Sequence, residues 1–358
     1  MDITHLAGKR GMRRLALGLA VVALVSSVAV VAAGAQRSSS ASTKGPLIDV
    51  TETGFKVISL APVYIAIDHG DFKRNGLNFT LQELQSGALG APTIISGNAQ
   101  FTDLGVNDVV NLYQQKKSVE LVYNLEKSLT MDLIFSKKAA QEKGITPSSP
   151  LKKRFLALKG LHIGITTPGA PTDIYPRYFM KQVGLDPAKD ATFVPIGNAA
   201  ALVGALQAGR IDAFMLSPPG PYLAQKDGFG TVMIKGDDSL PVFKTYDFTS
   251  VAVTQSYAAA HPDVVADYVK AVDEATTWMI AHPAQATALL HKNQFSDTDM
   301  PTLTLSVKLF LETANPTGLM TKAGVANQVD VLKQMDAMTG TAPLTDGVIW
   351  SDKFTKGK

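Results

Sequence analysis

The sequence predicts an α/β fold made of two lobes around a shared cleft, and three observations support this. Between about residues 55 and 254, short apolar runs alternate with helical stretches, which is typical of α/β proteins. A helix–glycine–strand–loop unit occurs twice, as "APTIISGNAQFTDLGVND" over residues 91–108 and as "LVGALQAGRIDAFMLSPP" over residues 202–219. From about residue 255 onward, the apolar spacing becomes helical.

The first 35 residues have the layout of a secretory signal peptide. A basic stretch over residues 9–14 precedes an apolar run over residues 15–33, and Ala33-Gly34-Ala35 is a small-residue cleavage site. We therefore expect cleavage after Ala35 and a periplasmic location. The alternative is a retained membrane anchor, because an apolar run of this length could just span a bilayer. Residues 36–50 begin rich in serine and predict a flexible leader.

Charge and cysteine content exclude several classes of protein. The chain has 34 Lys and Arg and 31 Asp and Glu, of which the first 35 residues hold four basic and one acidic side chain, so the exported chain is neutral. A neutral chain without a basic run argues against a nucleic-acid partner. The absence of cysteine excludes a thiol nucleophile, a thiolate metal site and a lipid-modified cysteine. We expect no metal and no cofactor.

The alternating pattern predicts ten strands in two sets, separated near residue 150. The first set is expected at residues 55–59, 78–84, 100–104, 119–125 and 131–136, and the second at 161–166, 191–196, 211–216, 231–235 and 248–254. Helices are expected at residues 62–72, 171–184 and 198–209, where a proline or an asparagine marks the start and a glycine often marks the end. Further helices are expected at residues 261–283, 284–293, 298–314 and 323–338.

The order of these elements predicts that the second lobe is inserted into the first. We expect lobe I to comprise residues 51–131 and 251–358, and lobe II residues 132–250. The chain would then cross between the lobes near Thr130–Asp132 and again near Asp247–Ser250. The final segment, residues 251–358, is expected to be helical and to pack against lobe I.

Loops at the ends of the predicted strands are the candidate binding site. In an open α/β sheet, ligands bind outside the carboxyl ends of the strands, where helix starts offer free backbone N–H groups. Small residues there allow close backbone approach, and hydroxyls and amides supply directional hydrogen bonds. Each loop taken alone can also be an ordinary turn with an ordinary cap. The candidate ligand-binding residues are Ser59, Leu60, Tyr64, Ser86, Gly87, Asn107, Thr130, Thr167, Gly169, Ala170, Thr172, Asn198, Ser217, Pro218, Tyr222 and Phe248.

Three blocks of the sequence resemble one family in the family's order. They are "PVYIAIDHGDFKRNGLNFTL", the stretch from "LKGLHIGITTPGAPTDIYPRYF" to "GRIDAFMLSPP", and "HPDVVADYVKAVDEATTWMIAHPAQATALL". Together they resemble the nitrate, taurine and sulfonate group of substrate-binding proteins of ABC importers, relatives of the thiamine-precursor binders. The resemblance implies a type II periplasmic-binding-protein fold with two crossovers and hinge closure on a ligand, and it implies a membrane permease as partner. Gln100 stands at a position where the family commonly has an acidic residue. Asp212 is the acidic residue at the matching position of the second repeat.

Motifs of catalysis are missing from the sequence. Its six histidines form no His-Glu-x-x-His pattern, and no phosphate-binding glycine loop or Gly-x-Ser-x-Gly elbow occurs. The alternative, an exported enzyme on the same fold acting on a small organic or thiamine-precursor-like substrate, would need a titratable pair in the cleft. Asp103, Asp108 and Asp173 are the acidic candidates for such a pair, although helix capping explains the last two equally well.

The predicted loops contain no Lys or Arg, so an anion would be held by neutral donors and helix starts. We expect a small organic acid resembling a sulfonate, taurine or nitrate, bound by a monomer. Arg177 is expected to face solvent, although it could tilt inward. The alternative is that an aspartate in the cleft holds an amine or a pyrimidine.

Overall fold

The computed structural model describes residues 46–338 and 340–356. The predicted signal peptide and most of the predicted leader lie outside these residues. The predicted end of the leader at residue 50 is wrong, because strand β1 already begins at Ile48. Within the described ranges, no helix is long and apolar enough to cross a membrane.

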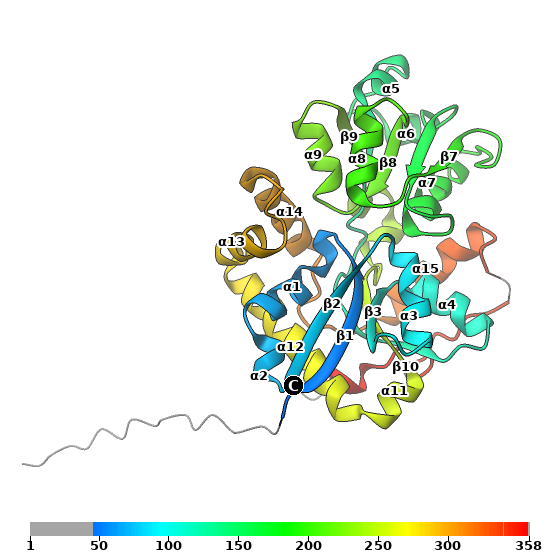
Figure 1. Ribbon diagram of the computed structural model, residues 1–358. Coiled ribbons are helices and arrows are strands. Elements are labelled where there is room, and N and C mark those ends of the chain that lie inside the picture. The colour runs from blue at the N-terminus through cyan, green and yellow to red at the C-terminus, as the bar shows by residue number, and fades with distance from the viewer. Residues whose placement is uncertain (1–45, 339, 357–358) are drawn as a thin grey trace, which may run out of the picture. The chain divides into compact units, whose positions relative to one another are not determined.

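Two five-stranded mixed sheets form the centre of the fold (Figure 1). The first sheet has the order β2-β1-β3-β10-β4 and the second the order β7-β6-β8-β5-β9. In each sheet the fourth strand in this order runs antiparallel to both of its neighbours, while the first three are parallel. The two sheets therefore share one topology. β3 and β8, which come from the two sequence repeats, occupy the same place in it.

Nine of the ten predicted strands are present within one or two residues. The strand expected at residues 55–59 is wrong, because β1 lies earlier and residues 58–60 form a turn of 3-10 helix. The strands are β1 Ile48–Phe55, β2 Leu77–Leu84, β3 Phe101–Leu104, β4 Val119–Asn124, β5 Asp132–Ser136, β6 His162–Ile165, β7 Thr192–Pro195, β8 Ala213–Leu216, β9 Gly230–Lys235 and β10 Ser250–Thr254.

Helices follow most strands and cover the sheets. Pro171 and Asn198 stand at the predicted helix starts, and Asn198 caps α8 by accepting a hydrogen bond from the Ala201 amide at 2.9 Å. The helices are α1 Ala61–Asp68, α2 Asp71–Arg74, α3 Gly90–Ile95, α4 Val106–Gln114, α5 Lys137–Glu142, α6 Leu151–Leu156, α7 Pro171–Lys181, α8 Ala199–Gln207, α9 Gly220–Lys226, α10 Gly236–Ser239, α11 Gln255–Ala260, α12 Pro262–Ala281, α13 Pro283–Asn293, α14 Met300–Thr313 and α15 Lys322–Gln334. Short 3-10 turns are η1 Ile58–Leu60, η2 Gly87–Leu89, η3 Pro241–Lys244 and η4 Asp352–Phe354.

The chain passes between the sheets twice, and the two crossing segments are hydrogen-bonded to each other. The Phe248 amide donates to the Glu126 carbonyl at 2.9 Å, and the Leu125 amide donates to the Thr249 carbonyl at 2.8 Å. The Leu129 amide bonds to the Phe243 carbonyl in the same way. Residues 125–129 and 243–249 therefore form a short antiparallel connection that joins the sheets.

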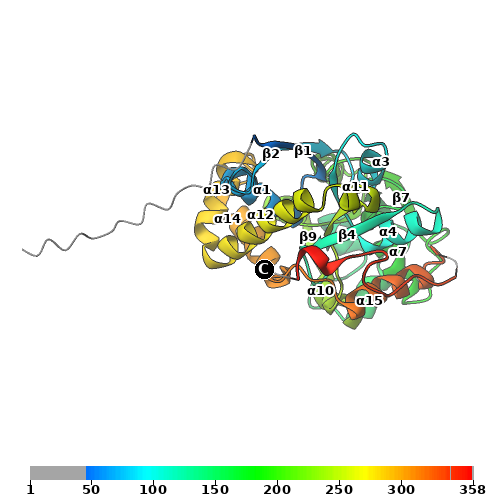
Figure 2. The same ribbon diagram turned by 90° about the horizontal axis from the view of Figure 1, so that it is seen from below.

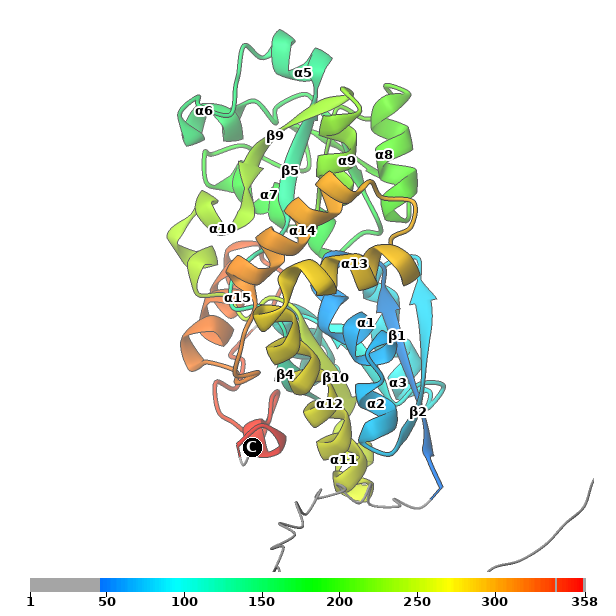
Figure 3. The same cartoon turned by 90° about the vertical axis from the view of Figure 1, so that its left-hand side faces the viewer.

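The C-terminal helices contact elements of both sheets. α12 packs along α1 and α2 beside the first sheet (Figure 3), and its buried Val265, Tyr268 and Val272 recur at three- and four-residue intervals, which agrees with the helical spacing expected from the sequence. α14 also contacts α9 of the second sheet. α15 lies beside α4 (Figure 2), while its Val331 is buried among the apolar residues of the second sheet. The last segment therefore does more than pack against the first sheet.

The departure at Gln100 preserves a hydrogen bond. The Gln100 side chain accepts from the Thr51 amide at 2.8 Å, while Asp212 accepts from the His162 amide at 2.8 Å in the second sheet. Either residue type offers an oxygen to the start of the neighbouring strand. The substitution therefore changes the charge but keeps the acceptor.

Candidate functional site

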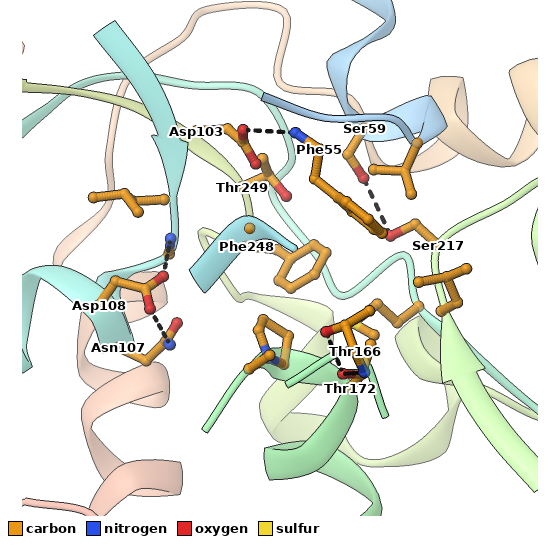
Figure 4. Close-up of a pocket in the computed structure, with 18 residues that line it drawn as sticks. Phe55, Ser59, Asp103, Asn107, Asp108, Thr166, Thr172, Ser217, Phe248 and Thr249 are labelled. Carbon is orange, nitrogen blue, oxygen red and sulfur yellow. Dashed lines mark hydrogen bonds between the residues drawn. The ribbon is translucent and has the colours of Figure 1, made fainter. Parts of the chain in front are cut away.

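A cavity of about 80 Å³ lies where loops from the two sheets converge (Figure 4). By volume it holds a handful of water molecules or one small organic molecule. The first sheet and the crossing segments contribute Phe55, Val57, Ser59, Gly87, Asp103, Leu104, Gly105, Asn107, Asp108, Met131, Phe248 and Thr249. The second sheet contributes Thr166, Ala170, Pro171, Thr172, Leu216 and Ser217.

Two carboxylates from consecutive elements of the first sheet face the cavity. Asp103 is in β3, and its Oδ1 accepts from the Phe55 amide at 3.3 Å. Asp108 is in the first turn of α4, where its Oδ2 accepts from the Gly105 amide at 2.9 Å. The Asn107 side-chain amide donates to Asp108 Oδ1 at 3.1 Å. A four-residue strand followed at once by a helix brings both acids to one wall.

Burial controls the protonation of these acids. It raises the pKa of Asp103 to about 7, against the opposing hydrogen bond from the Phe55 amide. It also raises the pKa of Asp108 to about 6, again against backbone and Asn107 hydrogen bonds. Removing water from around a carboxylate favours its neutral form. No Lys, Arg or His is among the residues that line this cavity.

Hydroxyl groups connect the two sheets around the cavity. Ser59 Oγ donates to Ser217 Oγ at 3.2 Å, and the Ile58 amide donates to the Pro218 carbonyl at 3.0 Å. Ser86 Oγ donates to Thr166 Oγ1 at 3.2 Å and lies 3.0 Å from Thr167 Oγ1. These contacts pair the loops after β1 and β2 with the loops after β6 and β8. The carboxyl ends of the parallel strands in the two sheets therefore meet at one place.

Two helix starts at the site are capped by the chain's own acids. Asp108 caps α4, and Asp173 accepts from the Gly169 amide at 2.9 Å at the start of α7. Arg177 pairs with Asp173 and stacks on the Phe193 ring at 3.6 Å, so it does not line the cavity. A capped helix start has less positive potential to offer to an anion.

The structure brings seven of the predicted site residues to the cavity wall. They are Ser59, Gly87, Asn107, Ala170, Thr172, Ser217 and Phe248. Two more, Ser86 and Thr167, form hydrogen bonds between the sheets beside it. Their contact with a ligand stays a prediction.

Seven predicted site residues do not line this cavity. Leu60 and Tyr64 are buried in the apolar core of the first sheet. Thr130 donates to Glu126, and the Tyr222 hydroxyl donates to Asp132 at 2.5 Å, so both are engaged in buried hydrogen bonds. Those outside the lining are Leu60, Tyr64, Thr130, Gly169, Asn198, Pro218 and Tyr222.

Sequence reasoning missed much of the wall. Phe55 ends β1 and was expected to begin a strand, Thr249 ends the second crossing segment, and Met131 directly precedes β5. Asp103 and Asp108 were not among the predicted ligand-binding residues; they were named as candidate acids of an enzyme, and an aspartate in the cleft was expected to hold an amine or a pyrimidine only as an alternative. The signal that was available is the position of Asp103, one residue before the end of its strand.

Comparison with known proteins agrees with this architecture. YtlA of Bacillus subtilis is 23% identical over 299 residues, covering 83% of this chain and 84% of YtlA. The alkanesulfonate-binding protein SsuA of Xanthomonas axonopodis pv. citri, solved with MOPS bound, superposes with a TM-score of 0.66 at 15% identity, covering 86% of this chain and 97% of SsuA.

The periplasmic nitrate-binding protein NrtA of Synechocystis PCC 6803 gives a TM-score of 0.61 at 16% identity, covering 72% of this chain and 69% of NrtA. These structures share the periplasmic-binding-protein fold, and their names describe binding proteins rather than enzymes. The profile of the NMT1-like family matches residues 52–291, which is more than half of the sequence. The protein therefore belongs to the NMT1-like family.

Proposed function

We propose that this protein is an exported substrate-binding protein that holds one small polar molecule in the cavity between its sheets and delivers it to an ABC import permease. Membership of the NMT1-like family and the shared fold with SsuA and NrtA support a binding role. The predicted signal peptide supports a periplasmic location. We propose that the protein acts as a monomer without a cofactor.

One observation carries this proposal: the cavity is lined from both sheets, and the described part of the chain crosses between these sheets twice. A ligand in such a place contacts both halves at once and stabilises their approach. We propose that residues 125–129 and 243–249 act as the hinge. The hydrogen bonds from Ser59 and Ser86 to the second sheet would then form when the halves close.

The names of SsuA and NrtA support the sequence-based prediction of a sulfonate-like or nitrate-like ligand. The lining opposes this prediction, because it contains two carboxylates and no basic side chain. The helix starts that were expected to attract an anion already carry Asp108 and Asp173. We therefore propose a small polar molecule and not specifically a sulfonate.

The rival function is an exported enzyme, and the observation in its favour is the pair Asp103 and Asp108. Asp103 accepts a hydrogen bond from the Phe55 amide, and Asp108 accepts one from the Gly105 amide. These structural roles are a sufficient reason for the positions of both acids. A binding protein must release its ligand unchanged. This difference separates the two functions.

The test is a thermal-shift screen of the exported protein against small acids, amines, amides and pyrimidines. A true ligand raises the unfolding midpoint in proportion to the logarithm of its concentration above its Kd. Mass spectrometry after long incubation should recover that compound intact. Conversion of the compound would overturn the proposal in favour of the enzyme.

A further inference from the structure

The ionisable side chains that line the cavity are all acidic. Asp103 and Asp108 line it, and no Lys, Arg or His is among the lining residues. In a partly dehydrated site, charges interact more strongly than in water. A bound anion would add a third negative charge without any basic partner. A cation would favour the ionised form of both acids and pair with them.

A third carboxylate lies directly behind the wall. Glu126 is fully buried in the crossing segment, and the hydroxyls of Ser59 and Thr249, which line the cavity, lie near its carboxyl group. Its Oε2 accepts no hydrogen bond from any described residue. An unpartnered buried carboxyl oxygen is costly and favours a positive or hydrogen-bond-donating group nearby.

Aromatic rings provide the rest of the surface that a cation needs. Phe55 and Phe248 both line the cavity (Figure 4), and each is less than one-tenth exposed. The Phe248 ring packs against Tyr175 at 6.0 Å, which holds its position. The face of an aromatic ring carries partial negative charge and attracts organic cations. Carboxylates on one side and rings on the other suit a flat or compact cation.

We infer that the ligand is a small organic cation with N–H donors, such as an amidine or a primary amine, bound by Asp103 and Asp108 and packed against Phe55 and Phe248. This inference rests on the proposed function, because it assigns the chemical class of the transported molecule. The N–H groups would donate to the carboxylates, and the carbon frame would contact the rings.

The test uses molecules of one shape and three charges. Acetamidine, acetamide and acetate form a small set, and benzamidine, benzamide and benzoate form a larger one. We expect the amidine of at least one set to raise the unfolding midpoint of the exported protein, with the neutral amide weaker and the carboxylate inactive. Tetramethylammonium, a cation without N–H groups, should bind more weakly than the amidine.

Variants of the two acids identify the site. Asp103→Asn and Asp108→Asn should each weaken amidine binding by about ten- to hundredfold, the range for a lost charged hydrogen bond. Asp173→Asn is the matched control, because Asp173 also caps a helix start but does not line the cavity. It should change amidine affinity by less than about threefold. The ligand-free midpoints of Asp103→Asn and Asp108→Asn report whether these proteins fold.

The outcomes separate the two proposals. Binding of acetate, benzoate or ethanesulfonate in preference to the amidines would overturn the inference of a cationic ligand. It would leave the proposed transport function intact. No stabilisation by any amidine, or amidine binding that survives both Asp→Asn changes, would also overturn it. Chemical conversion of a bound amidine would overturn the transport function instead.

Discussion

Ser59 and Ser217 are 158 residues apart in the chain, and their side-chain oxygens lie 3.2 Å apart in a buried hydrogen bond. Ser59 belongs to the turn after β1 in the first sheet, and Ser217 follows β8 in the second. Both also line the cavity. The bond therefore connects the two halves at the place where a ligand would be enclosed.

Replacing Ser217 with alanine should weaken ligand binding. The change leaves Ser59 without its partner across the cavity and destabilises the closed arrangement by about 0.5–1.5 kcal/mol. We expect a rise in Kd of about two- to tenfold for whichever compound the screen identifies, measured by calorimetry. Ser96→Ala is the control, because Ser96 is exposed and bonds only within its own helix turn, to the Thr93 carbonyl. Equal effects of the two changes would show that the bond is not part of closure.

Gly169 should matter for stability and not for binding. It was predicted to contact the ligand, but it does not line the cavity, and its φ of +79° is one that other residues rarely adopt. Gly169→Ala should therefore lower the free energy of unfolding by about 1–2 kcal/mol. Urea unfolding measures this loss, and Kd should stay within about twofold of wild type. A large loss of affinity at unchanged stability would restore Gly169 to the site.

Most strands could be predicted because they are short apolar runs between turn residues. β1 could not, because its sequence "IDVTETGF" is rich in polar residues, and the partners of its buried polar side chains are distant in the chain. Glu52 is fully buried and accepts from the Tyr268 hydroxyl at 2.5 Å, and Thr53 bonds to Thr102 at 3.1 Å. No local pattern reveals such partners.

The site was predictable in outline but not in its wall. Strand ends could be identified from the sequence, and seven of the residues chosen there reach the cavity. Which side of each loop faces the other sheet depends on tertiary contacts. Tyr222 shows this, because it was expected in the cleft but instead donates to Asp132, the first residue of β5. The negative sign of the wall also becomes visible only when Asp103 and Asp108 are seen together.

The stability of the protein should fall as the pH rises from about 5 to 7. Burial raises the pKa of Glu126 from 4.5 to about 7, opposed by hydroxyls of Thr130, Thr249 and Ser59. In this window the unfolded chain has lost the proton and the folded chain still holds it, so raising the pH favours unfolding by ~1.4 kcal/mol per unit for such a group. Asp103 and Asp132, with pKa values also raised to about 7 by burial, act in the same direction.

Glu126→Gln tests the contribution of this one group. Glutamine keeps the size and the hydrogen-bonding oxygen but cannot ionise, so the loss of stability between pH 5 and pH 7 should be smaller than in wild type. Urea midpoints at four pH values measure the slope. Glu142→Gln, on the exposed surface of α5, should keep the wild-type slope. A Glu126→Gln slope parallel to wild type would mean that Glu126 titrates normally in the folded protein.

Gly236 should be needed beside the proposed hinge because there is no space for a side chain. A Cβ there would lie 2.2 Å from the Met131 carbonyl oxygen and 2.8 Å from that of Leu129, both in the crossing region. Its amide also donates to Asp132 Oδ1 at 3.1 Å. Gly236→Ala must push the crossing chain aside, and we expect a loss of about 1–3 kcal/mol of stability together with weaker ligand binding.

Gly204→Ala is the matched control, since the same change at a position with open space should act in the opposite direction. Gly204 lies inside α8, and a Cβ there meets no other atom within 4 Å. Alanine is the better helix former, so this variant should gain about 0.5–1 kcal/mol and bind as wild type does. Chemical unfolding measures the stability of both variants, and calorimetry measures their affinity for the ligand. Gly236→Ala reports the effect of backbone crowding, and Gly204→Ala reports a gain in helix propensity alone. If Gly236→Ala were as stable as wild type and bound ligand equally well, the chain around Leu129 and Met131 would have room to move. Close packing at Gly236 would then not be needed for the proposed hinge.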